Sequence, residues 1–257
     1  MKPWLSPTAL KLFKDCPRCG FDATIVKFKR PKGAFPSLPN GVDAVVKRYM
    51  DQFRGTLPPE LAHLEGHRLM DEQATIDKYR IWNGLKTIYN VTVNRPTETL
   101  PERKVTHTML LNGGIDDALY NDTGQAVVFD VKTRKDEPDE DYGMKYYTTQ
   151  VNCYGWMLKE NGFDVADYGY LWYWWPVGVN AKGIMQFGQK TLKMPVDFTE
   201  APRIMDEIAA NLPPVSFEAL QYRQFFKSAS DCEYCSWVQE ANNYEQAEKD
   251  SLAGATG

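Results

Sequence analysis

The sequence has no apolar segment long enough to cross a membrane as a helix. Its longest apolar-looking stretch is YGYLWYWWPVGV, residues 168–179, whereas a membrane-spanning helix needs about 20 apolar residues. The first residues also lack the apolar core of a secretory signal peptide. We therefore expect a soluble, cytoplasmic protein with no membrane partner.

Signatures of motors and repeat proteins are missing as well. No GxxxxGK[ST] phosphate loop is present, which argues against an ATP-driven motor within this chain, and no internal repeat or low-complexity tract occurs. What the sequence does contain is 43% hydrophobic and 13% aromatic residues over 257 positions. A chain of this length and composition can bury a substantial core, as one large domain or as a domain with an insert.

The net charge of −4 conceals an asymmetry along the chain. Residues 1–54 hold 11 Lys/Arg against 4 Asp/Glu, a net charge of +7, so residues 55–257 carry −11. The basic part includes the run KFKRPK. Such a run fits a solvated face and a phosphate-contacting surface about equally well. Its basic residues are the candidates for nucleic-acid binding: Lys27, Lys29, Arg30 and Lys32.

Four of the five cysteines form two Cys-x-x-Cys pairs near the two ends of the chain. The pairs are Cys16 with Cys19 and Cys232 with Cys235, and Cys153 stands alone. Disulfides are unusual in cytosolic proteins, whereas four thiolates suit a tetrahedral zinc ion or an iron–sulfur cluster. We therefore expect a metal site, which we call the cysteine staple, that joins the terminal segments. The alternative is four unrelated buried thiols.

Helical signals come first along the chain. The segment LSPTALKLFKDCP predicts a helix with Ser6 at the N-cap and Pro7 at the first helical position. Residues 41–90 are expected to be a mainly helical insert. Within this insert His63 and His67 are four residues apart and would share a helix face, a pattern that is more often structural than catalytic.

Strand patterns follow after Pro101. KVTHTMLL alternates polar and apolar residues, and IDDALY and AVVFDVK flank the turn-forming run NDTG. A hairpin that turns there places Asp116 opposite Asp130 on neighbouring strands. Lys132, two residues after Asp130, points to the same face. The sequence therefore predicts that two carboxylates and one ammonium group converge.

The strand around this triad is apolar, so two carboxylates there would be too costly to leave unpaired. A hard divalent cation, Mg²⁺ or Mn²⁺, suits such oxygen ligands, with the Val131 carbonyl as a third candidate. Lys132 could orient or deprotonate an attacking water and stabilise a phosphate. The alternative is a structural Asp–Lys salt bridge, because Asp-x-Lys is common by chance.

A further helix and strand complete the expected core. YYTTQVNCYGWMLKENG predicts a helix that ends at Asn-Gly and carries Gln150 and Tyr154 on one face, both suited to positioning a phosphate or a water. DYGYLWYWWPV then returns to a strand, which indicates an α/β protein. Residues 239–257 are polar and are expected to form a flexible tail.

In their order, SPTALKLFKDCP, GGID, FDVKT, QVNCY and CEYC resemble the PD-(D/E)XK nuclease superfamily. The similar branch contains RecB-like nuclease domains and CRISPR-associated exonucleases with iron–sulfur clusters. The resemblance implies a restriction-endonuclease-like core, which is a mixed central sheet flanked by helices. It also implies one nuclease domain over residues 1–238 that includes the insert and the staple segments 16–19 and 232–235.

The resemblance also implies roles for individual residues. Asp116 and Asp130 would hold the catalytic metal beside a catalytic Lys132, and Gln150 and Tyr154 would support them. An upstream histidine would join the metal, His67 before His63, and Glu102 would be an accessory ligand. Iron–sulfur members usually supply one N-terminal and three C-terminal cysteines, whereas this chain has two and two. The choice between zinc and a [4Fe-4S] cluster stays open, and the family favours the cluster slightly.

The leading hypothesis is a metal-dependent DNA nuclease, an exonuclease that acts on ends or single strands. It would serve recombination, repair, CRISPR adaptation or phage DNA processing, with recombination or CRISPR-adaptation proteins as partners. A second hypothesis is a noncatalytic nucleic-acid-binding or assembly subunit that retains the nuclease fold. A third and weaker one is a cysteine-ligated redox protein.

Overall fold

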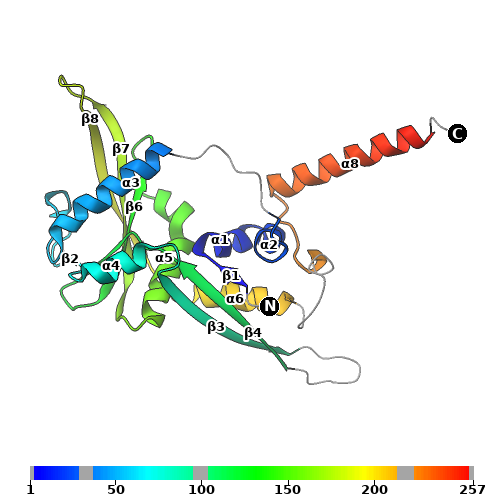
Figure 1. Cartoon of the computed structure of the whole chain (residues 1–257), viewed down its shortest axis with the longest axis horizontal. Coiled ribbons are helices and arrows are strands. Elements are labelled where there is room, and N and C mark those ends of the chain that lie inside the picture. Colours follow the sequence, from blue (N-terminus) through cyan, green and yellow to red (C-terminus); the bar gives the residue numbers. More distant parts are fainter. Residues whose placement is uncertain (1–2, 29–36, 95–103, 213–222, 255–257) are drawn as a thin grey trace.

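The computed structural model describes residues 3–28, 37–94, 104–212 and 223–254. Within them the strands form two sheets, of three and five strands (Figure 1). The smaller sheet has the order β1 (Trp4–Leu5), β4 (Lys104–Gly113) and β3 (Leu85–Asn94). The larger has the order β2 (Arg68–Leu69), β5 (Asp117–Tyr120), β6 (Ala126–Thr133), β7 (Val165–Val179) and β8 (Met185–Pro195).

Both sheets are mixed. In the smaller sheet β1 is parallel to β4 and β3 is antiparallel to it, and in the larger sheet β6 is parallel to β7 while the other pairs are antiparallel. The predicted mixed α/β architecture with a restriction-endonuclease-like core is therefore confirmed. Where we expected one central sheet, the strands divide into two, and the chain passes from β4 to β5 through Gly113 and Gly114.

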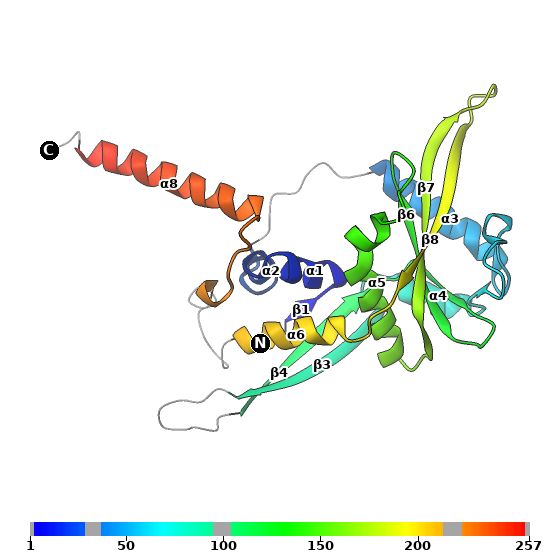
Figure 2. The same cartoon turned by 180° about the vertical axis from the view of Figure 1, so that it is seen from behind.

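Helices flank both sheets (Figures 1 and 2). They are α1 (Pro7–Asp15), α2 (Pro17–Phe21), α3 (Ser37–Met50), α4 (Gln73–Arg80), α5 (Tyr142–Glu160), α6 (Glu200–Asn211) and α8 (Glu233–Gly254). One π-helical turn covers Asp22–Val26, and short 3-10 turns cover Asp51–Phe53, Pro59–Leu61 and Arg223–Phe225. The predicted cap of α1 is confirmed, because the Ser6 hydroxyl accepts a hydrogen bond from the Ala9 N–H at 3.1 Å.

Strand β6 is covered on both faces. Val128 belongs to the apolar cluster that includes Val151 of α5, whereas Phe129 belongs to a second cluster that includes Val46 of α3. Because successive strand residues point to opposite faces, Asp130 and Lys132 share the face of Val128, under α5. The charged end of the strand is thus enclosed by a helix and not turned to solvent.

The expected helical insert over residues 41–90 is corrected in part. Helices α3 and α4 lie there, but so does the short strand β2, and residues 85–90 already belong to the ten-residue strand β3. The sequence of β3, LKTIYNVTVN, alternates and is rich in β-branched residues, a pattern typical of a strand. The turn before β3 depends on Gly84, because a Cβ there would lie 1.7 Å from the Lys78 carbonyl oxygen.

Residues 239–254 of the expected tail, which spans 239–257, are helical. The segment from Glu233 continues as the 22-residue helix α8, which points away from the sheets in both views (Figures 1 and 2). Its sequence contains four Glu, three Ala and two Gln residues, which are strong helix formers. Across the described ranges, none of the helices combines the length and apolar character needed to span a bilayer.

Candidate active site

The two predicted carboxylates lie at the end of the β5–β6 hairpin. Its register is antiparallel and pairs Asp117 with Phe129, so one step beyond this pair Asp116 lies opposite Asp130. The Asp116 carboxylate accepts a hydrogen bond from the Val131 N–H at 2.8 Å, which fixes it across the strand. At the other end the chain turns at Gly124, whose φ of +84° favours glycine.

Lys132 lies on the same face as Asp130 and forms an ion pair with it. The Asp130 side chain is 2% exposed and the Lys132 side chain 15% exposed. The Lys132 ammonium also lies 4.7 Å from the ring centroid of Tyr147 on α5. The structure therefore brings the three predicted charged groups together beneath α5.

The two carboxyl groups have opposite pKa shifts. Burial raises the pKa of Asp130 to about 7, and the negative charge of Asp116 adds to the rise while Lys132 opposes it. Burial acts in the same direction on Asp116, but the positive charges of Lys47 and Lys132 outweigh it and lower the pKa of that carboxyl. Two acids that interact so strongly fit a shared divalent cation, because a cation between them removes their mutual repulsion.

Lys47 on α3 is a site residue that the sequence did not reveal. Its ammonium lies 2.6 Å from Oδ1 of Asp116 and 2.8 Å from Oδ2 of Asp43. It reaches Asp116 because α3 packs across the face of β6 opposite α5. A lysine in a helical segment is usually a solvated residue, so only the tertiary packing identifies it as part of the site.

Gln150 and Tyr154 lie on the side of α5 that faces the carboxylates. The Gln150 amide donates a hydrogen bond to the Tyr154 hydroxyl at 3.0 Å. Burial raises the pKa of Tyr154 well above its ordinary range, and the charge of Asp130 adds to the shift, which places the phenol close to that carboxyl. Gly113 permits this approach, because a Cβ there would lie 3.1 Å from the Tyr154 ring.

A buried ion network holds the strand that follows Asp116. Asp117 is fully buried and pairs with Arg54 through two hydrogen bonds, of 2.7 and 2.6 Å, and with Arg80 at 2.9 Å. Both arginines also contact Asp51. Arg80 donates a further hydrogen bond to the Asp116 carbonyl at 2.8 Å. The network fixes the backbone of Asp116. Of the two neighbouring acids in GGIDD, Asp117 therefore holds the strand in place, and Asp116 presents its carboxylate to Asp130.

Neither histidine is placed beside the carboxylates. His67 contacts the Tyr168 hydroxyl at 3.0 Å and the Glu65 carbonyl at 2.9 Å, and His63 contacts the Thr191 hydroxyl at 2.7 Å. Over the part of the chain that the structure describes, four cysteines form the one group of three or more His, Cys, Asp or Glu side chains close enough to share an ion. The predicted histidine ligand is therefore not brought to Asp116 and Asp130.

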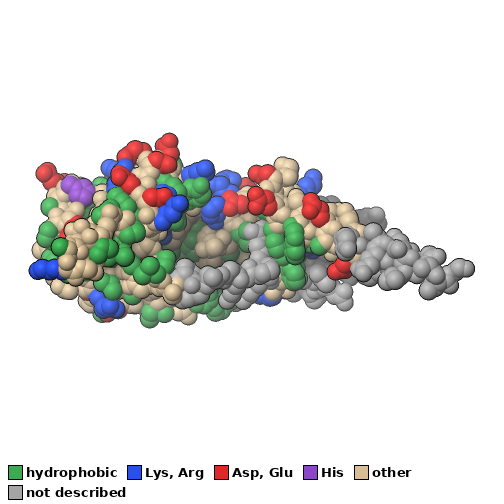
Figure 3. All heavy atoms as spheres, turned by 90° about the horizontal axis from the view of Figure 1, so that it is seen from above, with side chains coloured by type: hydrophobic (Ala, Val, Ile, Leu, Met, Phe, Trp, Pro, Cys, Tyr) green, Lys and Arg blue, Asp and Glu red, His purple; other side chains and the backbone are tan. Residues whose placement is uncertain are grey.

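Other predicted residues divide into two groups. Lys27 is described and exposed, and it lies beside a cavity near β1. Glu102, Lys29, Arg30 and Lys32 lie outside the described residues. On the face of the molecule shown in Figure 3, acidic and basic side chains alternate along one edge.

The four paired cysteines do come together, as predicted. The sulfurs of Cys16, Cys19, Cys232 and Cys235 all lie within 4.8 Å of one another. The sulfur of Cys235 lies 3.7 Å from that of Cys16 and 3.4 Å from that of Cys19, and the Cys19 sulfur lies 3.6 Å from that of Cys232. This donor set can hold a metal such as zinc or an iron–sulfur cluster.

Side chains around the cysteines reinforce the link between the chain ends. Arg223 forms two-pronged hydrogen bonds with the buried Asp22 at 2.8 to 3.0 Å. Phe226 stacks on Phe21 with ring centroids 4.3 Å apart. The Arg18 side chain donates to the Phe226 carbonyl at 3.2 Å. The N- and C-terminal segments are therefore joined by packing and ion pairing as well as by the cysteines.

Comparisons with known proteins give one family. The model of the PD-(D/E)XK nuclease superfamily matches residues 4–239. No curated protein matches the chain. One solved structure, titled "Crystal structure of SSO0001", is 16% identical and covers 82% of this chain and 78% of that chain, with a TM-score of 0.34. A similarity of that size carries no argument about fold or function.

Proposed function

Because the chain belongs to the PD-(D/E)XK nuclease superfamily, we propose that it is a Mg²⁺- or Mn²⁺-dependent deoxyribonuclease, an exonuclease that acts on DNA ends or single strands. The observation that carries the proposal is the pairing of the buried Asp130 with the partly buried Asp116, with Lys132 at their side. Charges of this kind are costly to bury, and Asp116 still raises the pKa of Asp130 although Lys47 and Lys132 lie beside the two carboxylates. A site kept at such a cost is typical of catalysis.

In this proposal Asp116 and Asp130 hold the metal, and the Val131 carbonyl is a third ligand. A bound divalent ion would polarise the phosphodiester and stabilise its developing negative charge. Against the effect of burial, Asp130 and Asp116 raise the pKa of Lys132 and keep it an ammonium, so Lys132 donates a hydrogen bond that orients the attacking water and stabilises the negative charge of the phosphate. The Tyr147 ring beneath this ammonium limits where the group can lie. Gln150 and Tyr154 act as one hydrogen-bonded unit that positions the phosphate or the water.

Lys47 has a separate task in the proposal. It neutralises Asp116 in the metal-free protein, together with a contact to Asp43. This contact keeps one carboxylate ionised and aimed across the hairpin while Asp130 has a raised pKa. When a metal neutralises the pair, the Lys47 ammonium becomes available to a substrate phosphate on the α3 side of the site.

We further propose that the cysteine staple holds a single zinc ion. Zinc–sulfur bonds of about 2.3 Å in a tetrahedron separate the sulfurs by about 3.8 Å. Three of the six sulfur pairs lie 3.4 to 3.7 Å apart, and all four sulfurs lie within 4.8 Å of one another. A cluster of four irons and four sulfides needs more room between its thiolates, so this spacing supports zinc over the cluster that the family resemblance favours.

A cleavage assay tests the proposed function. Purified protein is incubated with end-labelled single- and double-stranded DNA and Mg²⁺ or Mn²⁺, beside Asp130→Asn and Lys132→Ala. The wild type should shorten the DNA only with divalent metal, and either substitution should abolish this. Asp122→Asn, in the exposed turn of the same hairpin, is the matched control and should cleave normally. Equal cleavage by wild type and both site variants would refute the assignment.

A further inference from the structure

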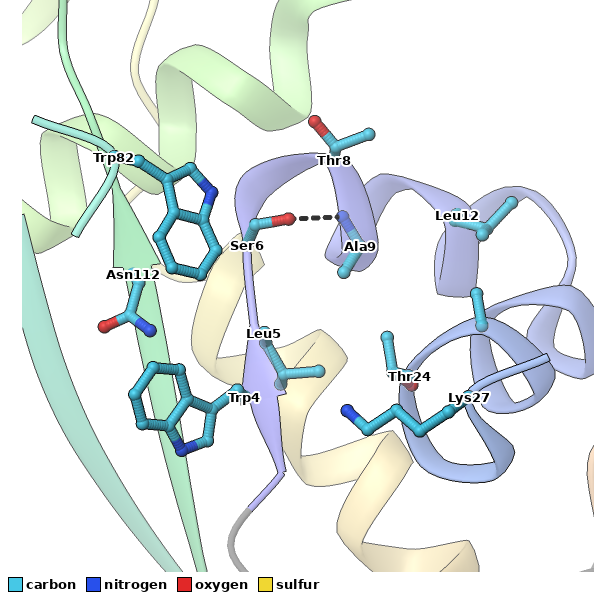
Figure 4. A pocket seen from close by; sticks show the side chains of 11 residues that line it. Trp4, Leu5, Ser6, Thr8, Ala9, Leu12, Thr24, Lys27, Trp82 and Asn112 are labelled. Carbon is cyan, nitrogen blue, oxygen red and sulfur yellow. Dashed lines mark hydrogen bonds between the residues drawn. The ribbon is translucent and has the colours of Figure 1, made fainter. Parts of the chain in front are cut away.

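A cavity of about 350 Å³ lies beside the loop that carries Asp116 and has no task in the proposed reaction. It is enclosed by β1, the start of α1, the π-helical turn and the end of β4 (Figure 4). Its volume is in the range of pockets that bind small molecules. Three features of its lining identify the kind of ligand that it fits.

The first feature is a buried amide without a partner. Asn112 is 1% exposed, and among the described residues neither its side-chain oxygen nor its side-chain nitrogen has a hydrogen-bond partner. A buried amide in this state is costly, so such groups are normally paired. The amide offers one acceptor beside one donor, which is the pattern that matches the hydrogen-bonding edge of a nucleobase.

The second feature is a pair of exposed indole rings. Trp4 is 51% exposed and Trp82 is 65% exposed, although large aromatic side chains are usually buried. Figure 4 shows the two rings on either side of Asn112. Aromatic faces beside a hydrogen-bonding group are the arrangement by which proteins stack and hold single-stranded bases.

The third feature is a single positive charge. Of the described residues that line the cavity, Lys27 alone is charged, and its ammonium extends toward Leu5 and Trp4 (Figure 4). Its backbone has a φ of 66°, a left-handed conformation that is uncommon for lysine. A base in the cavity would hydrogen-bond to the amide and stack on both rings, and a neighbouring phosphate would pair with the Lys27 ammonium.

A short segment of the chain links the cavity to the carboxylate site. Asp116 is four positions after Asn112, so their Cα atoms lie at most about 14 Å apart, a distance that a few nucleotides can bridge. The segment just before Trp82 also contacts the Asp116 loop. Gly114 packs against the carbonyls of Arg80 and Ile81, and the Arg80 side chain donates a hydrogen bond to the Asp116 carbonyl. A nucleic-acid strand in the active site would therefore reach both halves of the cavity.

We propose that this cavity binds one unpaired nucleobase of the strand whose backbone enters the active site. The proposal rests on the proposed nuclease function and adds that the substrate is single-stranded at this position. Trp4 and Trp82 stack the base, Asn112 hydrogen-bonds to its edge, and Lys27 pairs with a neighbouring phosphate. We call these four residues the base pocket.

Binding of short oligonucleotides tests the base pocket without catalysis. The full chain is titrated into fluorescein-labelled dT pentamer and into an abasic pentamer with the same backbone, without added divalent ions, and polarisation is read. Stacking of one base corresponds to an affinity change of about 5- to 150-fold. We expect the wild type to bind dT pentamer at least about fivefold more tightly than the abasic strand.

Variants then locate the effect. Trp82→Ala and Trp4→Ala should weaken binding of dT pentamer by at least about fivefold, while binding of the abasic strand changes less than about twofold. Trp237→Ala removes a similarly exposed tryptophan on α8, 60% exposed, and should bind both strands as the wild type does. Asn112→Leu should weaken dT pentamer binding yet raise the melting temperature, because it removes an unpaired buried amide.

The outcomes separate this inference from the proposed function. Equal wild-type affinity for the two pentamers, or unchanged dT affinity in both tryptophan variants, would overturn the base pocket even if the protein cleaves DNA. Loss of base-dependent binding in those variants would support the pocket even if no metal restores cleavage, and in that case the hydrolytic assignment alone fails.

Discussion

Replacing Asp130 with asparagine should stabilise the metal-free protein while abolishing cleavage. Burial raises the pKa of this carboxyl from 3.8 to about 7, and Asp116 adds to the rise. Above pH 7 the ionised carboxylate therefore costs the fold up to about 4 kcal/mol, at about 1.4 kcal/mol per pH unit. Asparagine has nearly the same shape and no charge. The raised pKa already includes the attraction of Lys132, and Asp116 remains beside that lysine, so we expect a net gain of about 2 to 4 kcal/mol.

The gain should depend on pH with a definite sign. A carboxyl whose folded pKa is raised takes up a proton on folding, so its contribution to stability is complete below pH 3.8 and is lost as pH rises through about 7. The advantage of Asp130→Asn should therefore be largest above pH 7. It should shrink by about 1.4 kcal/mol for each pH unit below that value.

Thermal unfolding measures this effect. The two proteins are compared at pH 8.5 and pH 5.5 in buffer freed of Mg²⁺ and Mn²⁺ on a chelating resin, which leaves the cysteine-bound metal in place. For a chain of this size about 1 kcal/mol moves the melting temperature by about 2–4 °C, so a rise of about 4–16 °C is expected at pH 8.5. Asp122→Asn should change it by less than about 2 °C. A lower melting temperature for Asp130→Asn at pH 8.5 would refute the reasoning.

Two further outcomes concern stability and metal content. Asp117→Asn should lower the free energy of unfolding by about 3–5 kcal/mol in urea titrations, because Arg54 and Arg80 lose the fully buried carboxylate that they share and keep, among the described residues, only Asp51 as a charged partner. The same change at Asp15, in an exposed ion pair, should stay within about 1 kcal/mol, and equal effects would contradict the network. Cys232→Ser should remove zinc from the purified protein by elemental analysis, whereas Cys153→Ser should retain it; a metal content that Cys232→Ser does not change would exclude the staple.

The β5–β6 hairpin and α1 could be predicted from sequence because their signals are local. Asn121 and Gly124 form the turn, and alternation along β6 sets which side chains share a face. The same local rules placed Asp130 and Lys132 together. The Cys-x-x-Cys spacing near both ends of the chain predicted the cysteine cluster, because two such pairs together supply the four thiolates of a metal site.

Other parts of the site depend on packing between distant segments. Lys47 reaches Asp116 only because α3 crosses β6, and no pattern in the sequence encodes that contact. The sequence does not distinguish the role of Asp117 from that of Asp116, and only the ion pair between Asp117 and Arg54 shows that Asp117 is structural. His67 and Asp130 fall on different sides of the sheet, since His67 contacts Tyr168 and Tyr170. The spacing of two histidines along the chain does not determine on which side of the sheet they lie.

Direct titration of the site with Mn²⁺, followed by electron paramagnetic resonance, tests the central claim. If Asp116 and Asp130 share a divalent ion, the wild type should bind Mn²⁺ at this site, and Asp116→Asn and Asp130→Asn should each remove that signal while Asp122→Asn retains it. Bound Mn²⁺ of equal amount and affinity in wild type and both site variants would contradict the claim that these two carboxylates form the metal centre of a nuclease.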